Sequence, residues 1–387
     1  MAVHLHFVLL LFLPVDLDAL TITTFNILAP VHRSMNSLNH RESERDDWWR
    51  PRAMGVADYI SRRFADSDVV LLQEWWFDDE FAAIFDSVVG DAFVRVAERR
   101  PGPGRDDGMC CLVRKTGKLE LVTSTSVSTG PQRIAQIVHC RERRRSGSSD
   151  CDEPPRDVFV ANAHLSYPGD PDPNVNGRRQ ANEATIILDA LARARDGWGG
   201  EDGTNDCWLE AICGDFNSDS TGAAATVVES RGFVNGASAA AEQALAGGVG
   251  GRVNVGVTHR DHLGNRVSVD HVFLRSADRR GGGRGGNASF RDDDGASVPS
   301  PSPPPSAAAL ALGFLDARGT RILGVRRGDI HLDGRAVLSD HRPVTARIAW
   351  PGRTDGSKGR EVLSSDIYIN ATMPLDPLEP AWGMITG

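Results

Sequence analysis

Polar side chains that could do chemistry stand directly after apolar runs in this sequence. In ICGDFN the apolar run ends on Asp215, and Asn217 stands two residues further on. Because alternate residues of a strand point to the same side, the two side chains would face one spot. Such a pair either caps a turn as two Asx residues or serves a reaction that needs a carboxylate beside an amide.

The same placement recurs along the chain, in TFNIL, LLQE, NAHL, GDFN and SVDH, while in LSDHRP the polar pair stands just before an apolar run. The polar residues concerned are Asn26, Glu74, His164, Asp215, Asp270, Asp340 and His341. Taken singly, each has an ordinary interpretation: Glu74 as a solvated carboxylate, Asn26 as a turn residue, His164 as a core histidine. Strand ends are also where functional loops gather, and all these pieces occur together in one order. The set therefore favours one shared site.

Apolar patterns predict the elements that would hold these side chains. Runs rich in apolar and β-branched residues predict strands at residues 21–28, 67–74, 92–97, 109–114, 119–127, 133–139, 157–165, 207–217, 267–276 and 342–350. Helical spacing predicts helices near residues 48–64, 78–89, 178–195 and 222–231. Strands alternate with helices at first and then cluster, which predicts an α/β fold with two packed sheets and helices outside.

Both ends of the chain and one internal segment differ in composition from the rest. Residues 1–19 are an apolar leader, either a signal segment or a cap on the domain, and their apolar run is too short to span a bilayer. Residues 277–308 are rich in Gly, Ser and Pro and predict a flexible surface insertion. The folded domain is predicted over residues 20–350, with residues 351–387 as a tail. The protein is then cytoplasmic, or secretory if the leader is a signal peptide.

Composition excludes several classes of protein. The net charge of −9 disfavours broad contact with nucleic acid or anionic membranes, so a phosphate-bearing ligand would need local arginines or a bound cation. The six cysteines form no CxxC pair and no Cys/His cluster, which predicts buried free thiols rather than a zinc site. The glycines of residues 281–286 match GxGxxG without a flanking strand and helix, so a dinucleotide site is not expected.

The ordered motifs FNIL, LQE, NAHL, GDFNS, VDHVFL and SDHRPV resemble those of the endonuclease/exonuclease/phosphatase superfamily over most of residues 20–350. FNILAP, DGMCCLVRK and RESERDDWWRPR are similar to its deadenylase-related branch, and RGFVNG with VTHRDHLGNRVSVDHVFL to plant and algal members. The resemblance implies a four-layer sandwich of two packed mixed β-sheets flanked by helices. Some of those proteins carry EF-hands, but this sequence has no EF-hand calcium loop.

The resemblance also implies an activity, a Mg²⁺-dependent phosphoesterase that hydrolyses a phosphodiester by in-line attack of water. Mg²⁺, with Mn²⁺ as a substitute, would be held by Glu74 and Asp340, since hard cations prefer carboxylates and water. Asp215 would orient and deprotonate the attacking water. Asn217 would hold Asp215 or the phosphate.

The remaining candidates would surround the phosphate. His341, polarised by Asp270, would donate a hydrogen bond to a phosphate oxygen, and His164 would contact the phosphate from the other side. Asn26 would help to set the site. Arg133 and Asp107 are further candidates for substrate contact.

The substrate stays open at this stage. The acidic net charge fits RNA ends or a nucleotide better than long duplex DNA. The alternatives are a phosphoesterase acting on phospholipids or inositol phosphates, and a non-catalytic scaffold that keeps the fold. No protein partner is indicated.

Overall fold

The computed structural model describes residues 19–35, 38–143, 155–198, 207–236, 258–260, 266–278, 321–327, 331–332 and 336–349. Residues 1–18 of the predicted leader and the predicted tail at 351–387 lie outside the described residues. So does the predicted insertion, apart from residues 277 and 278, which still belong to a strand.

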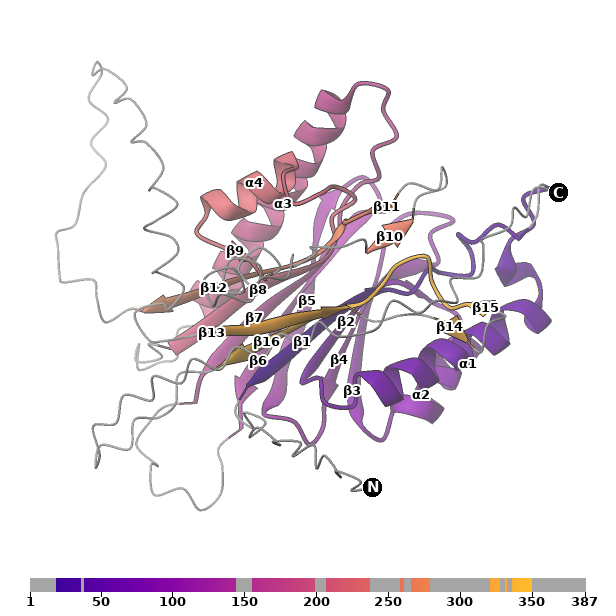
Figure 1. The fold of residues 1–387 in the computed structure, drawn as a ribbon, viewed down its shortest axis with the longest axis horizontal. Coiled ribbons are helices and arrows are strands. Elements are labelled where there is room, and N and C mark those ends of the chain that lie inside the picture. The colour runs from indigo at the N-terminus through magenta and orange to yellow at the C-terminus, as the bar shows by residue number, and fades with distance from the viewer. Residues whose placement is uncertain are drawn as a thin grey trace, which may run out of the picture.

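The first sheet has six strands in the order β13-β16-β1-β2-β4-β3 (Figure 1). They are β1 (Leu20–Asn26), β2 (Val69–Trp76), β3 (Phe93–Arg99), β4 (Asp107–Arg114), β13 (Arg321–Arg327) and β16 (Val344–Ala349). β1 and β2 run parallel, and the other neighbouring pairs of this sheet are antiparallel.

The second sheet has six strands in the order β5-β6-β7-β8-β12-β9. They are β5 (Leu119–Gly130), β6 (Arg133–Glu142), β7 (Asp157–His164), β8 (Cys207–Asp215), β9 (Val234–Asn235) and β12 (Asp270–Asp278). Here β7 and β8 form the parallel pair. Two short ladders stand apart, β10 (His259–Arg260) with β11 (Arg266–Val267) and β14 (His331–Leu332) with β15 (Ala336–Val337).

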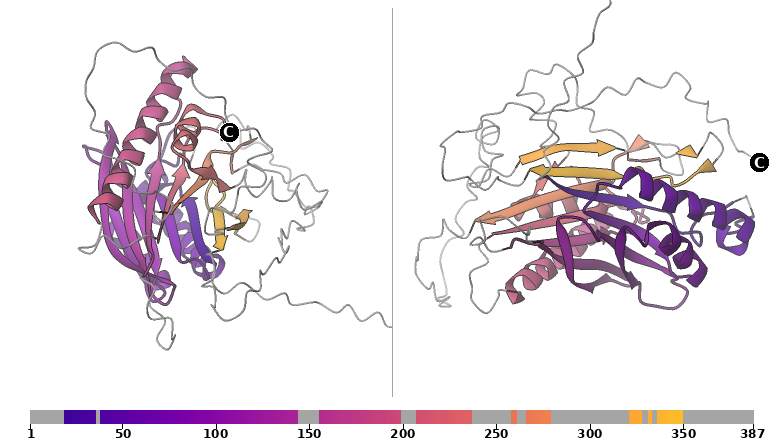
Figure 2. Two further views of the ribbon diagram at one scale, coloured as in Figure 1. Left: turned by 90° about the vertical axis from the view of Figure 1, so that its left-hand side faces the viewer. Right: turned by 90° about the horizontal axis from the view of Figure 1, so that it is seen from below.

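Helices cover the outer face of each sheet, as Figures 1 and 2 show. They are α1 (Asp46–Arg63), α2 (Asp79–Val89), α3 (Pro173–Gly197) and α4 (Ala223–Ser230), with a 3-10 turn η1 (Glu42–Glu44) before α1. One apolar cluster lies between the sheets, a second packs α1 and α2 on the first sheet, and a third packs α3 and α4 on the second. The α/β fold, a four-layer sandwich of two mixed sheets flanked by helices, is therefore confirmed.

Local chemistry moves several boundaries away from their predicted places. α3 begins at Pro173 rather than near residue 178, because the side chain of Asp172 accepts a hydrogen bond from the backbone N–H of Asn174 and Pro173 suits the first helical turn. β12 runs from Asp270 to Asp278, so it begins and ends later than the predicted 267–276. The strand β13 was not predicted, since a glycine and three arginines interrupt its apolar pattern.

The two parallel pairs bring their carboxyl ends to one edge of the sandwich. β1 and β2 end near Asn26 and Glu74, while β7 and β8 end at His164 and Asp215. β12 is antiparallel to β8 and begins opposite Asp215, and β16 is antiparallel to β1 and begins at the same edge. Six chain segments that lie far apart in the sequence therefore meet there.

A buried amide pair joins the two sheets beneath this edge. The side-chain Nε2 of Gln73 donates to Oδ1 of Asn162 over 2.7 Å, and Nδ2 of Asn162 donates to the backbone carbonyls of Leu72 and Cys110. Because a buried amide without partners would be costly, these bonds fix how β2 and β7 face each other. They therefore also help to set the distances between the polar side chains at the edge of the sandwich.

Two further expectations concern thiols and membranes. Cys110, Cys111, Cys140 and Cys213 are buried free thiols, as predicted. None of the helices in the described part of the chain is long and apolar enough to cross a membrane.

Candidate functional site

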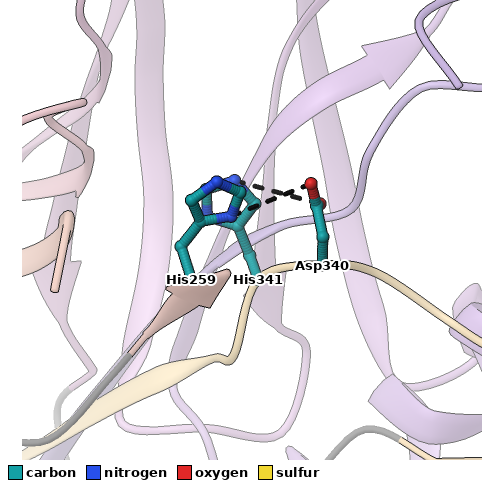
Figure 3. A group of neighbouring side chains, drawn as sticks. All are labelled: His259, Asp340 and His341. Atoms are coloured by element: carbon teal, nitrogen blue, oxygen red, sulfur yellow. Dashed lines mark ion pairs between the residues drawn. The ribbon is translucent and has the colours of Figure 1, made fainter. Parts of the chain in front are cut away.

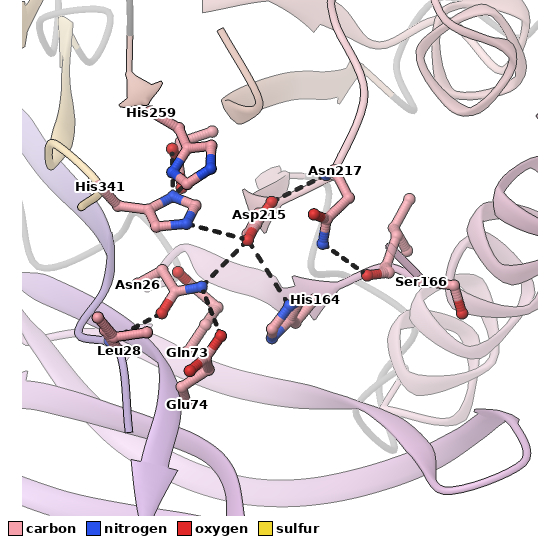
Figure 4. A network of polar contacts seen from close by, with 12 residues as sticks. Asn26, Leu28, Gln73, Glu74, His164, Ser166, Asp215, Asn217, His259 and His341 are labelled. Atoms are coloured by element: carbon pink, nitrogen blue, oxygen red, sulfur yellow. Dashed lines mark hydrogen bonds and ion pairs between the residues drawn. The ribbon is translucent and has the colours of Figure 1, made fainter. Parts of the chain in front are cut away.

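Three side chains meet at one carboxylate oxygen of Asp215, as Figure 4 shows. The amide Nδ2 of Asn26 donates to Oδ2 of Asp215 over 3.0 Å. The Nε2 atoms of His164 and His341 each lie 3.6 Å from the same oxygen. These four residues come from β1, β7, β8 and the segment before β16, and all four are buried. The structure therefore brings these four predicted site residues together.

Glu74 joins the group through the same amide. Nδ2 of Asn26 also donates to Oε1 of Glu74 over 3.2 Å, and the backbone N–H of Ala29 donates to Oε2 over 3.0 Å. Glu74 has φ +60°, in the left-handed region, at an irregularity in the β2–β4 ladder. A bulge of this kind turns a side chain out of its strand register, and such strain is typical of functional sites.

His341 is oriented by a carboxylate on β12. Its Nδ1 lies 2.9 Å from Oδ2 and 3.2 Å from Oδ1 of Asp270. The backbone N–H of Asp270 donates to the hydroxyl of Thr258, and the backbone N–H of His341 donates to the hydroxyl of Ser339. Ser339 in turn donates to the carbonyl of Asn26 over 2.7 Å. Nε2 of His341 is thereby left to face Asp215.

His164 receives a hydrogen bond from an arginine, and this bond determines its tautomer. Nη2 of Arg100 lies 2.6 Å from Nδ1 of His164, and a guanidinium can only donate. Burial, and then the charges of Arg100 and Arg133, lower the pKa of His164 well below its ordinary value. The neutral ring therefore carries its proton on Nε2, the nitrogen that faces Asp215.

The two histidines that flank Asp215 differ in charge. For His341, burial opposes the charged form, but the carboxylates of Asp270 and Asp215 outweigh it and raise the pKa well above the ordinary value. For Asp215, burial raises the pKa to about 7, against the opposing charge of His341. The site therefore combines a cationic imidazole, a neutral imidazole and a carboxyl group that titrates near neutrality.

Asn217 does not lie on the same strand face as Asp215, because β8 ends at Asp215 and not at residue 217 as predicted. Asn217 has φ +50°, which takes the chain out of the extended conformation. Its backbone N–H donates to Oδ1 of Asp215 over 2.8 Å, whereas its side-chain Nδ2 donates to the carbonyl of Leu165 over 2.9 Å. The backbone of Asn217, rather than its amide side chain, contacts Asp215.

Asp340 lies at the mouth of the site, with 40% of its side chain exposed. Its carboxylate oxygens are 3.8 Å from Nδ1 of His259 and 4.0 Å from Nε2 of His341 (Figure 3). In the described part of the chain, two groups place potential metal-ligand atoms within 4.8 Å of one another: His259, Asp340 and His341, and Asp215, Asp270 and His341. Glu74, the predicted metal ligand, belongs to neither group and instead contacts Asn26 and Ala29.

Asp107 and Arg133, the further candidates, lie on the His164 side. Asp107 is fully buried, with Oδ2 3.3 Å from Nε of Arg100 and Oδ1 3.2 Å from Nε2 of His32. Nη1 of Arg133 is buried without a hydrogen-bond partner within the described structure. Burial, and then the charge of Arg100, lower the pKa of Arg133 to about 10. A donor held in this way is available to an anion.

Sequence reasoning missed four residues of this site: Arg100, Thr258, His259 and Ser339. Arg100 follows a predicted strand, so it fits the same strand-end pattern as the residues that were found. Thr258 and His259 belong to the VTHRDH segment, whose sequence indicated only the resemblance to plant and algal members. Ser339 immediately precedes the Asp340–His341 pair.

Known proteins share this fold and this sequence pattern. The model of the endonuclease/exonuclease/phosphatase family matches residues 23–341. An uncharacterized calcium-binding protein of Arabidopsis thaliana is 24% identical over 256 residues, which are 65% of this chain and 50% of the relative. The chain thus spans half the length of that relative.

Solved structures similar to the chain support the same fold. A functionally unknown conserved protein from Enterococcus faecalis has a TM-score of 0.51 at 16% identity, over 85% of this chain and 99% of its own. The catalytic domain of human Nocturnin, with a bound sulfate anion, has a TM-score of 0.50 at 13% identity, over 86% of this chain and 94% of that domain's chain. With the family match covering the whole of the described site, the chain belongs to the endonuclease/exonuclease/phosphatase family.

Proposed function

We propose that this protein is a divalent-cation-dependent phosphoesterase that hydrolyses a phosphodiester by in-line attack of water. The observation that carries the proposal is the convergence of Asn26, His164 and His341 on one carboxylate oxygen of Asp215. A buried carboxylate that is surrounded by hydrogen-bond donors can take a proton from water while those donors bind the phosphate.

The carboxylates at the mouth of the site suit a hard cation. Glu74 is half-buried, is held by Asn26 and Ala29, and has a strained backbone that turns it out of its strand. A carboxylate with lone pairs left beyond these bonds matches the preference of Mg²⁺ and Mn²⁺ for oxygen ligands. Glu74 would be the main ligand, and Asp340 would contribute directly or through water. The cation would offset negative charge on the phosphate oxygens and on the leaving oxygen.

Asp215 is the proposed general base. A pKa of about 7 allows it to be ionised in part of the molecules at neutral pH and still to accept a proton readily. The backbone N–H of Asn217 and the side chain of Asn26 hold its two oxygens in place, one each. Asn217 therefore acts by orienting the base.

The two histidines and the arginines are proposed to bind the phosphate. His341, kept cationic by Asp270, donates from Nε2, and neutral His164 donates from its own Nε2–H. Arg133 offers its unpartnered Nη1 to a second anionic group of the substrate. Asp107 is a positioning residue, since its buried carboxylate faces Arg100 and His32.

RNA ends or a nucleotide are the substrates that we favour. The net charge of −9 disfavours long duplex DNA, while the cationic groups Arg100, Arg133 and His341 surround the site itself. This distribution suits a substrate with a few phosphates close together. A phospholipid or inositol phosphate remains the alternative substrate class.

The purified chain should be assayed against poly(A), single-stranded DNA, NADPH, sphingomyelin and inositol phosphates, each with and without Mg²⁺ or Mn²⁺. The proposal expects metal-dependent release from at least one phosphodiester, greatest for RNA or the nucleotide. A well-folded protein that releases nothing with either metal would instead support the scaffold alternative.

A further inference from the structure

The structure assigns a second cation site beside the catalytic centre, formed by His259, Asp340 and His341, which binds a borderline-soft divalent cation such as Zn²⁺. The three side chains are drawn in Figure 3. Their potential ligand atoms all lie within 4.8 Å of one another. Two imidazoles and one carboxylate are a donor set that suits Zn²⁺ or Co²⁺ far better than Mg²⁺, which prefers oxygen ligands.

The spacing of the ligand atoms is close to what such an ion requires. With metal–ligand distances of about 2.0–2.1 Å, tetrahedral ligands stand roughly 3.4 Å apart. Nδ1 of His259 is 3.8 Å from Oδ2 of Asp340, and Nε2 of His341 is 4.0 Å from Oδ1 of the same carboxylate. These two distances run to different oxygens of Asp340, whose side chain is 40% exposed and so has room to rotate towards the nitrogens. Three protein ligands leave the fourth position to water.

The backbone holds the two imidazoles together. His259 and His341 face each other across an isolated antiparallel bridge, so their side chains project on one side. Their rings stack with centroids 4.2 Å apart at an interplanar angle of 25°, so one ring must turn for both in-plane lone pairs to reach one ion. The backbone N–H of Arg342 donates to the carbonyl of Thr258 over 2.6 Å, which locks the residues next to both histidines.

Each ring has one nitrogen near the carboxylate of Asp340, and Nε2 of His341 must release its proton before it can bind a metal. Nδ1 of His341 is bound to the carboxylate of Asp270, and a ligating histidine characteristically gives its other nitrogen to such a carboxylate. Nδ1 of His259 is buried without a hydrogen-bond partner in the described structure, and its nearest carboxylate is Asp340.

Occupation of this site would have a consequence for turnover, which rests on the proposed function. Nε2 of His341 is the atom that would bind the substrate phosphate, and Asp340 is a proposed contributor to the Mg²⁺ site. A Zn²⁺ ion bound to both therefore competes with catalysis. The protein is expected to be inhibited by Zn²⁺ in the presence of excess Mg²⁺.

Co²⁺, whose visible absorption reports nitrogen and oxygen ligands, tests the site directly without an activity assay. Wild type, His259→Gln and the control His40→Gln, an exposed histidine, should be titrated with Co²⁺ in excess Mg²⁺, after checking by thermal melting that each is folded. We expect one Co²⁺ per chain in wild type and His40→Gln, displaced by Zn²⁺. The affinity should fall by about 10-fold or more in His259→Gln, since even changes outside the ligand set cost about 10–100-fold.

Equal Co²⁺ affinity in wild type and His259→Gln would overturn the assignment, and so would a wild type that binds no Co²⁺. Because the titration needs no turnover, its outcome is independent of whether the proposed hydrolysis exists. If hydrolysis is observed, His259→Gln should need at least about 10-fold more Zn²⁺ for the same fractional inhibition. An unchanged Zn²⁺ sensitivity would reject the inhibitory role alone.

Discussion

Nδ1 of His341 and the carboxylate of Asp270 form a buried pair, 2.9 Å apart, that joins the start of β12 to the segment before β16. Asp270 stands opposite Asp215 in the β8–β12 ladder, so the imidazole lies between two carboxylates. This relationship fixes both the orientation of His341 and its charge.

Asp270→Asn should slow hydrolysis by about 100-fold or more, because an uncharged amide no longer stabilises the imidazolium. The folded pKa of His341 is raised, so the cation persists above its ordinary range in wild type and is lost at lower pH in the variant. The pH–rate profile should therefore show its basic limb moving to lower pH. Exposed Asp219→Asn is the control, and an unmoved basic limb in Asp270→Asn would contradict the assigned role.

Asp215→Asn should make the protein more stable at alkaline pH while removing activity. The pKa of Asp215 is raised from 3.8 to about 7, so between these values the folded state binds more protons than the unfolded state, and stability falls as pH rises. The amide of Asp215→Asn cannot ionise, so the stability of the variant does not fall with pH for this reason. Its melting temperature should exceed that of wild type above about pH 7, and the gain should vanish below about pH 4. A variant less stable than wild type at alkaline pH would refute the raised pKa.

Arg100→Met should allow His164 to adopt both of its neutral tautomers. In wild type, ring nitrogens observed by NMR should show the proton of His164 on Nε2, because Nδ1 accepts from Arg100. The variant should show a mixture of tautomers and a lower kcat. Detection of Nδ1–H in the wild-type ring would mean that the arginine bond is not formed in solution.

Gly214 lies immediately before Asp215 with φ +144°, and a Cβ there would stand 1.9 Å from the carbonyl oxygen of Ala163. Gly214→Ala should therefore destabilise the protein by at least about 2 kcal/mol in urea unfolding, through backbone strain and overlap. Gly197→Ala is the matched control, since a Cβ at Gly197 meets nothing within 4 Å, and its effect should stay within about 1 kcal/mol. Similar unfolding curves for the two variants would show that β7 and β8 approach less closely.

The sequence was sufficient for most of the fold and for the residues at the ends of long apolar strands. Asn26, Glu74, His164 and Asp215 each follow a run of buried residues, and a parallel pair necessarily brings its ends to one edge. The strand β13 could not be predicted in this way, because its arginines and glycine interrupt any alternation of apolar residues.

The parts that escaped prediction depend on tertiary contacts and on backbone turns. Arg100 stands at a strand end and His259 within a polar stretch, and only the packing of other strands places them against His164 and His341. Asn217 was predicted to share a strand face with Asp215, but its left-handed backbone turns the amide to Leu165. The two-residue period holds only while the chain is extended.

The most direct test of the whole account is the rate of Mg²⁺-dependent phosphodiester hydrolysis by Glu74→Gln. The amide keeps the shape of the side chain and can still accept from Asn26, but it lacks the charge that would hold the cation. With melting curves that match wild type, and with exposed Glu80→Gln as the control, the variant should lose at least about 10³-fold in rate. Near-wild-type hydrolysis by Glu74→Gln would contradict the account.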